Sequence, residues 1–364
     1  MAKFLKIIDF TLIIPAILLT SIGLLLIFST SFDTDPSFFV RQIVYVIFSI
    51  IIFFLISRFN FNTIVRSAPI LYIIILVILA ITLFFGDPIR GSTRWLDFSF
   101  VTIQGVELAK PVLALALASF ISINNPSNFK NLLISIFLII IPVALVASQP
   151  DLSNSFLLLV LWFFIVFIAG LDVYHLIITT LILLVTTPLI WGFILKGYQK
   201  SRILTFFNPN IDPQGAGYNI VQALIALGSG QLTGLGFGRG TQSHLEFLPE
   251  SRTDFIFSVA GEELGFIGLS LIIVLFSFLI FRIFRLASEM KQRNSKIFIF
   301  SVGFIIATQF FINAAMNMGI FPVSGVTLPF LSFGGSSILS LFIFLGFVQS
   351  AKNTQDMFDT YIAS

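Results

Sequence analysis

Long apolar runs alternate with short polar connections along almost the whole chain. Most runs are about 20 residues long, the length of an α-helix that crosses the hydrocarbon core of a bilayer. The period-2 alternation of a membrane β-barrel is absent from the sequence. The pattern therefore predicts an all-α polytopic membrane protein with ten transmembrane helices, whose ends are defined to within about four residues. The predicted helices cover residues 10–30, 39–57, 67–86, 102–123, 131–148, 153–170, 173–194, 254–283, 296–318 and 332–351.

The longest polar interruption covers residues 205–265, from the connection after the seventh predicted helix into the start of the eighth. The whole connection runs from about residue 195 to 253, and loops of this length are usually functional or disordered. Residues 217–230 are apolar but too few to span a bilayer, so we expect a helix that rests on or dips into the membrane. The chain 1–364 is thus expected to form a single integral membrane domain with one long loop and a short tail at 352–364.

Composition narrows the class of protein further. Only 10% of the residues are charged and 57% are hydrophobic, whereas a soluble protein carries about 25% charged residues. The absence of cysteine excludes disulfides, thiolate metal sites and cysteine nucleophiles. His175 and His244 are too few for a histidine metal site. The first apolar run is too long for the core of a signal peptide and lacks a cleavage pattern, so we expect it to remain as the first helix.

Lysine and arginine residues are concentrated in the connections on one side of the predicted bundle, and residues 282–296 alone contain five of them. Because cytoplasmic loops carry an excess of positive charge, both termini are predicted to lie in the cytoplasm and the long loop outside it. The cations on the outer side either reach to the membrane interface or bind an anionic substrate, and together they favour the substrate. These cations are Arg90, Arg94, Lys196, Lys200, Arg202, Arg239 and Arg252.

Charged residues also occur inside predicted helices, where they are energetically costly and usually functional. Glu107 and Lys110 are three residues apart in the motif ELAKP, so they share a helix face and can form an ion pair. The pair either holds helices together or shapes a cavity and contacts substrate, and the two roles are compatible. Glu262 belongs to a second motif, GEELG, whose two acids must face protein or water. The glycines that flank these acids allow close helix packing.

Glycines alternate with other residues in GLGFGRG, residues 234–240. Glycine adopts positive φ angles readily, and successive amide groups in such a conformation can bind an anion. Arg239 would add positive charge, and Gln242 and Ser243 follow directly as candidate substrate ligands. A dinucleotide-binding motif requires a preceding strand and a following helix, which the sequence does not indicate here, so the segment is at most a phosphate cradle.

Several charged residues lead into the eighth predicted helix. Glu250 and Arg252 precede Asp254, which we expect in the first helical turn, after a cap provided by Ser251 or Thr253. Stabilisation of an acid by the helix dipole is the structural explanation for Asp254. The chemical explanation, which we favour, is a general base at the mouth of a cavity lined by membrane helices.

Two further outer connections contain candidate ligands. In residues 91–100, Trp95 and two phenylalanines predict a segment that lies along the membrane interface. Arg94 in this segment either binds a lipid phosphate or belongs to a simple aromatic anchor. Asp151 follows Pro150 in the next outer connection, where it either caps a helix or contacts substrate.

Prolines and glycines interrupt the helical pattern in the last outer connection, residues 320–337. Irregular backbone at membrane depth is tolerated where it is buried in protein or lines a cavity. Ser332 and Ser336 are candidate hydrogen-bonding partners of a polar ligand in such a cavity. The alternative is a loop that simply re-enters the membrane interface.

Taken together, these motifs resemble the SEDS family (shape, elongation, division and sporulation) of bacterial cell-wall polymerases, over essentially the whole chain. Two features are more similar to RodA than to FtsW: the GTQS sequence before the FLPE segment, and PVSGV before the last loop. One departure is QPDLSN, where RodA-like chains usually have QPDLGT, which affects the neighbours of Asp151. The motifs that carry the resemblance are, in order, GSTRWL, ELAKP, QPDL, FNPNIDPQGAGYN, GTQSHLEFLPESRTDFIF, GEELGFIG and LPFLSFGGSS.

The resemblance implies a peptidoglycan glycosyltransferase in the bacterial cytoplasmic membrane, which joins lipid II into glycan strands on the outer face for cell elongation and shape. It also implies that Asp254 is the catalytic acid residue and that Glu107 and Lys110 lie in the cavity. A class B penicillin-binding protein and other elongation-complex membrane proteins are the implied partners, and no nucleic acid is expected. A divalent cation, Mg²⁺ or Mn²⁺, is the implied cofactor.

The expected chemistry agrees with the outer cations and acids. The donor sugar leaves on a lipid pyrophosphate, so cations that hold the pyrophosphate suffice without a strong general acid. Asp254 would accept the proton of the acceptor 4-hydroxyl, and the undecaprenyl chains need a groove between helices. The candidate substrate-binding residues are Glu107, Lys110, Arg94, Asp151, Arg202, Arg239, Gln242, Ser243, Glu250, Arg252, Glu262, Ser332 and Ser336.

Three alternative functions remain open. A lipid II flippase would explain the intramembrane ion pair and the interrupted helices, but we expect no polar cluster on the inner side comparable to the outer one, and no inverted repeat is evident. A division polymerase of the FtsW type has the same chemistry. A non-catalytic scaffold for division or elongation proteins leaves the membrane-embedded acids unexplained.

Overall fold

The computed structural model of the chain describes residues 8–32, 34–89, 92–97, 102–208, 211–212 and 215–363. Apolar α-helices make up most of this part, and each follows one of the apolar runs of the sequence. The helices are α2 (Phe10–Ser31), α3 (Ser37–Ile56), α4 (Phe61–Phe85), α5 (Gly105–Ile123), α6 (Phe129–Ser148), α7 (Leu152–Ile168), α8 (Val173–Leu189), the π-helix η1 (Ile190–Ile194) that continues α8, α12 (Ile256–Glu289), α13 (Arg293–Asn317) and α14 (Gly335–Ala363).

Within the described residues, nine helices are long and apolar enough to cross a membrane. They confirm the predicted polytopic helical architecture. The sixth predicted span corresponds to α7, which is apolar but has only 17 residues, so the count of ten remains a prediction. The expected short tail at 352–364 is mostly helical, because α14 continues to Ala363.

A small antiparallel sheet joins α4 to α5, and the sequence did not predict it. Its strands are β1 (Asp87–Ile89), β2 (Ser92–Asp97) and β3 (Thr102–Gln104), in the order β1-β2-β3. The interfacial segment expected at 91–100 is therefore largely a strand, and the fourth helix begins at Gly105 and not at residue 102. Strands of three to six residues are too short for hydrophobic periodicity to reveal. Phe98 and Phe100 lie outside the described residues.

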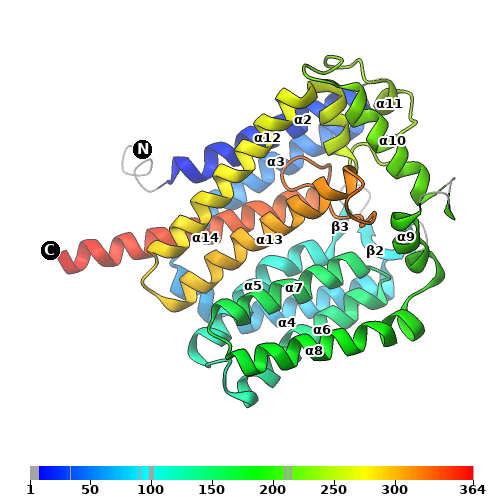
Figure 1. Cartoon of the computed structure of the whole chain (residues 1–364). Helices are drawn as coiled ribbons and strands as arrows, with labels where there is room; N and C mark the ends of the chain where they lie inside the picture. Colours follow the sequence, from blue (N-terminus) through cyan, green and yellow to red (C-terminus); the bar gives the residue numbers. More distant parts are fainter. Residues whose placement is uncertain are drawn as a thin grey trace.

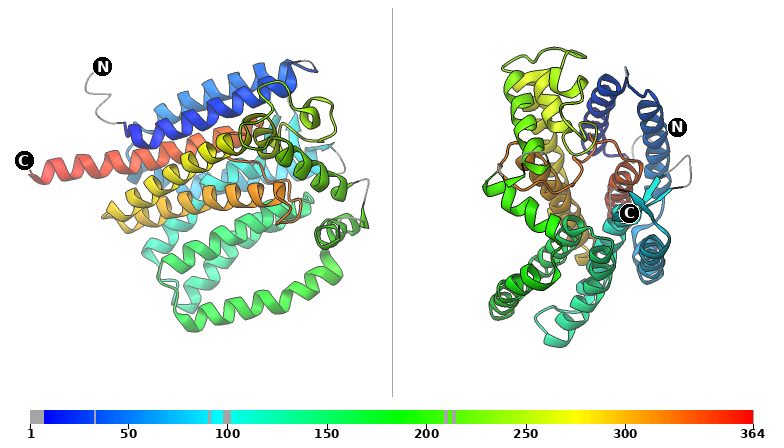
Figure 2. Two further views of the ribbon diagram at one scale, coloured as in Figure 1. Left: turned by 45° about the horizontal axis from the view of Figure 1, so that its top comes forward. Right: turned by 90° about the vertical axis from the view of Figure 1, so that its right-hand side faces the viewer.

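Consecutive helices run in alternating directions, so both termini lie at one end of the bundle (Figure 1). We call this the terminal end. The sheet and the three short helices of the long loop lie at the opposite, or loop, end (Figures 1 and 2). These short helices are α9 (Gly197–Phe207), α10 (Ala216–Ser229) and α11 (Thr241–His244).

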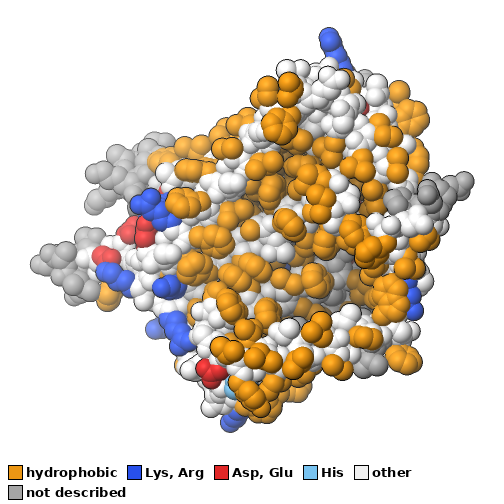
Figure 3. Space-filling view, in the orientation of Figure 1, with side chains coloured by type: hydrophobic (Ala, Val, Ile, Leu, Met, Phe, Trp, Pro, Cys, Tyr) orange, Lys and Arg blue, Asp and Glu red, His pale blue; other side chains and the backbone are white. Residues whose placement is uncertain are grey.

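Burial differs widely among the spanning helices. In the most apolar window of α14, 78% of the residues are buried, and the value is 67% for both α5 and α13, so these three helices form the centre of the bundle. In α8 and η1 only 7% are buried, and Figure 2 shows α8 at the edge of the bundle. Apolar side chains cover the middle of the visible face, and most of the charged ones gather near the terminal end (Figure 3). This distribution fits a protein surrounded by lipid.

A charged cluster ties three helices together at the terminal end. Asp9 caps the start of α2, and its buried carboxylate accepts hydrogen bonds from Arg282 at 2.5 Å and Lys352 at 2.9 Å. Burial alone would raise the pKa of Asp9, but the hydrogen bonds from Arg282, Thr11 and Lys352 hold it well below its usual value. The terminal end, which the charge pattern of the sequence predicts to be cytoplasmic, therefore has a buried charged cluster that was not expected there from the sequence.

Candidate active site at the loop end

Asp254 lies in a turn just before α12 and not in its first helical turn. The first helical residue is Ile256, and the cap position is taken by Phe255, whose side chain makes no capping bond. Ser251 and Thr253 therefore do not cap the helix as expected. Asp254 is half-buried, and one of its carboxylate oxygens lies 3.6 Å from the position that a Cβ atom of Gly325 would occupy. The acid thus faces the connection between α13 and α14.

The connection between α13 and α14 is bound to the segment that precedes Asp254. Ser332 Oγ donates to the carbonyl of Thr253 at 2.6 Å and accepts from the amide of Leu328 at 2.8 Å. The amide of Phe333 donates to the carbonyl of Arg252 at 2.8 Å. The hydroxyl of Ser332 therefore holds two stretches of backbone together, and its proposed contact with substrate remains a prediction.

Two buried asparagines of α13, which sequence reasoning missed, also reach this segment. Asn313 and Asn317 both donate a hydrogen bond to the carbonyl oxygen of Asp254. The signal that would have revealed them is a pair of amides four residues apart inside an apolar span, where polar side chains are rare.

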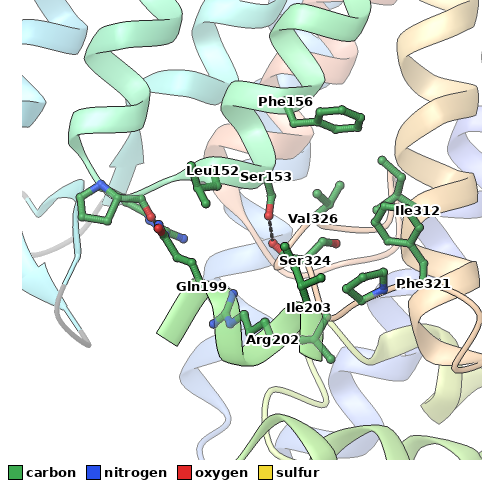
Figure 4. A pocket seen from close by; sticks show the side chains of 14 residues that line it. Leu152, Ser153, Phe156, Gln199, Arg202, Ile203, Ile312, Phe321, Ser324 and Val326 are labelled. Atoms are coloured by element: carbon green, nitrogen blue, oxygen red, sulfur yellow. Dashed lines mark hydrogen bonds between the residues drawn. The ribbon is translucent and has the colours of Figure 1, made fainter. Parts of the chain in front are cut away.

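A groove of about 250 Å³ opens beside this segment. It lies between the start of α7, α9 and the α13–α14 connection, and Ser153 donates a hydrogen bond to the carbonyl of Ser324 across it (Figure 4). The walls are mostly apolar, with Arg94 and Arg202 as the charged members. Ser324 and Val326 line the groove on either side of Gly325, so the groove adjoins the residue that faces the Asp254 carboxylate.

Arg94 and Asp151 meet at the start of α7. Asp151 is buried and caps the helix, since its carboxylate accepts from the amide of Asn154 at 3.2 Å and from its side chain at 2.9 Å. The capping explanation of Asp151 is thus confirmed. Arg94 Nε lies 3.8 Å from Asp151 Oδ2, and Arg94 also donates to the carbonyl of Pro150. These contacts anchor the guanidinium of Arg94 at the edge of the groove.

The predicted ion pair inside the bundle is present. Lys110 Nζ lies 2.6 Å from Glu107 Oε1, and both side chains are almost fully buried in α5. Ser336 binds β3, the strand that precedes α5. Its hydroxyl accepts from the amide of Gln104 at 2.9 Å and lies 3.3 Å from the carbonyl of Thr102. Ser336 thus joins β3 to α14, and a substrate contact for it stays a prediction.

The glycine-rich segment has the expected positive φ angles, but its amides are bound by other parts of the protein. Gly234, Gly236 and Gly238 have φ angles of +80°, +98° and +72°. The amides of Leu235 and Gly236 donate to carbonyls of α12 at 2.9 and 3.1 Å, and that of Gly238 donates to Ser29 at 3.1 Å. Amides that are bound within the protein do not form an anion nest, so the phosphate-cradle interpretation is wrong. Arg239 remains exposed at the end of the segment.

Residues just before the glycine-rich segment pair with α12 where that helix is interrupted. Gly265 lies inside α12 with a φ angle of +67°, which interrupts the helix. The amides of Phe266 and Ile267 bind the carbonyls of Gln231 and Leu232 at 2.9 and 3.1 Å in place of helical partners. Buried backbone groups must be paired, so these two hydrogen bonds satisfy amides that the break in α12 would otherwise leave without partners.

Replacing Gly234 by alanine should therefore destabilise the protein. A Cβ atom there would collide with the carbonyl of Glu263, and the alanine would have to keep a φ angle of +80°, so we expect a loss of about 1–3 kcal/mol of unfolding free energy or more. Gly228 is the matched control, because it lies in α10 with no atom within 4 Å of the position that a Cβ atom would occupy, and alanine there should be neutral or stabilising by up to about 1 kcal/mol. Thermal unfolding in detergent measures both, and equal melting temperatures would contradict the expectation.

The two acids of the GEELG motif face protein, as predicted. Glu262 is fully buried, and its carboxylate accepts from the amides of Gln242 at 2.7 Å and Ser243 at 3.1 Å, so it caps α11. Glu263 accepts from Ser29 at 2.5 Å and lies 3.1 Å from Nε2 of His244. Gln242, Ser243 and Glu262 thus form a cluster around α11, and their contact with substrate remains a prediction.

The two remaining charged candidates, Glu250 and Arg252, lie just before Asp254. Glu250 accepts a hydrogen bond from the hydroxyl of Thr253 at 2.9 Å. Arg252 donates to the carbonyl of Thr30 at 2.7 Å, and its guanidinium lies 4.8 Å from the ring centroid of Phe38. Burial lowers the pKa of Arg252, but arginine stays protonated at neutral pH. Arg252 therefore fixes the segment before Asp254 to the ends of α2 and α3.

The acids and histidines that the structure describes do not form a closed metal site. Among the residues that the structure describes, no three His, Asp or Glu side chains are grouped to hold a metal ion. Mg²⁺ is usually bound through one or two carboxylates together with substrate phosphates and water. Asp254 beside the groove fits this mode, in which the cation arrives with the substrate, and does not fit a metal held by protein ligands alone.

The comparisons with known proteins identify the family. The sequence profile of the cell cycle proteins FtsW, RodA and SpoVE matches residues 6–356. The chain belongs to this family. The family profile covers nearly the whole chain, from before α2 to within α14, and so confirms the resemblance to SEDS proteins.

Individual relatives include both main types of the family. The chain is 39% identical over 291 residues to the peptidoglycan glycosyltransferase MrdB of Escherichia coli K12, with 80% of this chain and 79% of MrdB covered. It is 37% identical over 338 residues to the probable peptidoglycan glycosyltransferase FtsW of Wigglesworthia glossinidia brevipalpis, with 89% and 88% covered.

Solved structures of the family have the same fold. A chain from a peptidoglycan synthase complex, studied for the structural coordination of polymerization and crosslinking, superposes with a TM-score of 0.81 at 28% identity and covers 94% of this chain and 96% of its own length. The rod shape determining protein RodA of Thermus thermophilus gives a TM-score of 0.71 at 27% identity, with 94% and 95% covered. These matches, together with MrdB, support the RodA-like assignment.

Proposed function

We propose that this protein is a peptidoglycan glycosyltransferase of the RodA type, which polymerises lipid II into glycan strands for cell elongation and shape. The observation that carries the proposal is a half-buried acid, Asp254, next to an apolar groove with two arginines at its edge. An apolar groove suits a polyprenyl chain, and the arginines suit the pyrophosphate that links the chain to the sugar. The relatives named as peptidoglycan glycosyltransferases support the same activity.

The reaction is a single displacement at the anomeric carbon of the donor sugar. The 4-hydroxyl oxygen of the acceptor attacks this carbon and forms the new glycosidic bond, while its proton passes to the carboxylate of Asp254. The bond from the anomeric carbon to the pyrophosphate breaks, and the pyrophosphate leaves with the electron pair. Arg94 and Arg202 stabilise the charge that develops on it, and a divalent cation, when bound, would supply further positive charge there.

The distribution of charge and the relatives support the proposed location and partners. Basic residues gather at the terminal end, which supports a cytoplasmic position for both termini and an outer position for the groove. The related chain from a complex that couples polymerization to crosslinking supports a class B penicillin-binding protein as partner.

A flippase is the second candidate because of the terminal-end cluster. Asp9, Arg282 and Lys352 place buried charge on the inner side, as a substrate path across the membrane would require. However, the Asp9 carboxylate is paired with both cations and joins α2, α12 and α14. This arrangement suits a structural ion pair better than a transient substrate site.

One assay separates the two functions. The purified protein is reconstituted in liposomes with fluorescent lipid II, a divalent cation and its penicillin-binding partner. We expect glycan strands on gels and no faster movement of the fluorophore between leaflets than in empty liposomes. Rapid movement of lipid II between leaflets without glycan strands would reject the polymerase in favour of the flippase.

A further inference from the structure

Two fully buried asparagines of α13 hold the main chain at the proposed catalytic acid. Asn313 and Asn317 lie one turn apart, and each has no exposed surface. Asn313 Nδ2 donates to the carbonyl of Asp254 at 2.9 Å, and Asn317 Nδ2 donates to the same oxygen at 3.0 Å. A carbonyl oxygen accepts two hydrogen bonds, so this oxygen is saturated by α13 alone.

Asn317 also provides the cap that α12 lacks. Its Oδ1 accepts from the amide of Ser258 at 3.1 Å and from the hydroxyl of Ser258 at 2.6 Å. The first amides of a helix need partners from outside the helix, and the cap residue Phe255 offers no side-chain acceptor. The side chain of Asn317, which belongs to α13, therefore fixes the start of α12 and the orientation of the turn that precedes it.

Asn313 connects the acid to the wall of the groove. Its Nδ2 donates a second hydrogen bond to the carbonyl of Val326 at 2.8 Å. Val326 lines the groove, and the preceding residue, Gly325, faces the Asp254 carboxylate. The NH₂ group of Asn313 thus links the backbone of Asp254 to the backbone of Val326 in the groove wall.

All four side-chain N–H hydrogens of Asn313 and Asn317 donate hydrogen bonds. Asn317 Nδ2 donates to the carbonyl of Asn313 at 2.9 Å in addition to Asp254. Primary amides inside a membrane span are costly unless they are satisfied, and leucine would fill similar space without that cost. The placement of these amides is therefore better explained by the geometry they impose than by packing.

We propose that Asn313 and Asn317 are positioning residues, which fix the Asp254 carboxylate beside the groove without touching the substrate. This inference rests on the proposed function of Asp254 as the base. Misplacement of a reacting group by about 1 Å lowers a rate by roughly 10²-fold. Loss of either asparagine should therefore lower kcat by about 10- to 100-fold and leave KM for lipid II nearly unchanged, because Arg94 keeps its own contacts with Asp151 and Pro150.

The test uses the full chain with its penicillin-binding partner and lipid II as substrate. Asn313→Leu and Asn317→Leu remove the amide hydrogens without adding charge. Gln309→Leu is the matched control, since Gln309 is a buried amide one turn earlier on α13 and takes no part in the hydrogen bonds described above. We expect a reduced kcat for the two asparagine variants and a normal kcat for the control. If a leucine variant does not fold, Asn313→Ala, which also removes the amide without adding charge and leaves the cap by Asn317 in place, gives the same comparison.

Repeating the measurement in an Asp254→Asn background separates positioning from general stability. A residue that acts through Asp254 should cause no further loss of the residual rate there, with melting temperatures close to that of the parent. Normal kcat in both asparagine variants, or the same fractional loss with and without Asp254, would overturn the inference. Full activity of Asp254→Asn would instead refute the proposed function, whatever the asparagine variants do.

Discussion

Asp254→Asn is expected to lower the rate of glycan polymerisation by about 10²- to 10⁴-fold, which is the usual contribution of a general base. The substitution keeps the size of the side chain and removes its capacity to accept the proton of the acceptor hydroxyl. The carbonyl of Asp254 stays bound by α13, so the fold should not change. Single-turnover polymerisation of fluorescent lipid II, with the melting temperature measured in parallel, checks both statements.

Two acids at the same end of the bundle serve as controls. Asp35 is exposed in the α2–α3 connection and binds the amide of Ser37 at 3.0 Å, so Asp35→Asn should polymerise at nearly the normal rate. Glu250 lies four residues before Asp254 and accepts from Thr253, and Glu250→Gln should have a smaller effect than Asp254→Asn. A larger loss at Glu250 would move the base to that residue.

Lys110→Met is expected to destabilise the protein by about 3–5 kcal/mol, because it leaves a buried carboxylate without its partner. The pair is short, at 2.6 Å, and both side chains are almost fully buried. The double variant Glu107→Gln/Lys110→Met removes both charges at once and should recover most of the stability, since apolar replacement of a whole buried pair is often neutral. Denaturation in detergent gives the three unfolding free energies that are compared.

The same double variant separates the two roles of the pair. We expect it to fold but to polymerise at least about 10-fold more slowly than the parent if the pair also shapes a substrate cavity, as the resemblance to SEDS proteins implies. Full recovery of both stability and polymerisation would show that the pair only holds the bundle together.

The spanning helices were predictable because lipid imposes a simple rule on sequence. A run of about 20 apolar residues must form a helix to satisfy its backbone, and every such run did. The β1–β3 sheet escaped because its strands are short: β1 and β2 lie outside those runs, and β3 takes only the first three residues of the run at 102–123. The extension of α14 escaped because its polar residues indicate a tail when seen alone, whereas Lys352 reaches Asp9 across 343 positions of sequence.

The candidate site was predictable where charge marked it. Asp254 and the Glu107–Lys110 pair stand out in an apolar chain. Uncharged amides such as Asn313 do not stand out in this way, although its hydrogen bonds fix the acid. The sequence also left open which outer arginines face the groove, because Arg252 is bound to α2 through a contact 222 positions away, and only packing reveals it.

The pH dependence of single-turnover polymerisation tests the role of Asp254 most directly. If Asp254 is the base, the rate of the parent protein falls on the acidic side as this carboxylate becomes protonated, and Asp254→Asn shows a low rate that lacks this decline. The size of the loss in Asp254→Asn alone does not distinguish a base from a binding residue, but the disappearance of the acidic limb does. An acidic limb of the same position and slope in both proteins would contradict the proposal that Asp254 accepts the proton.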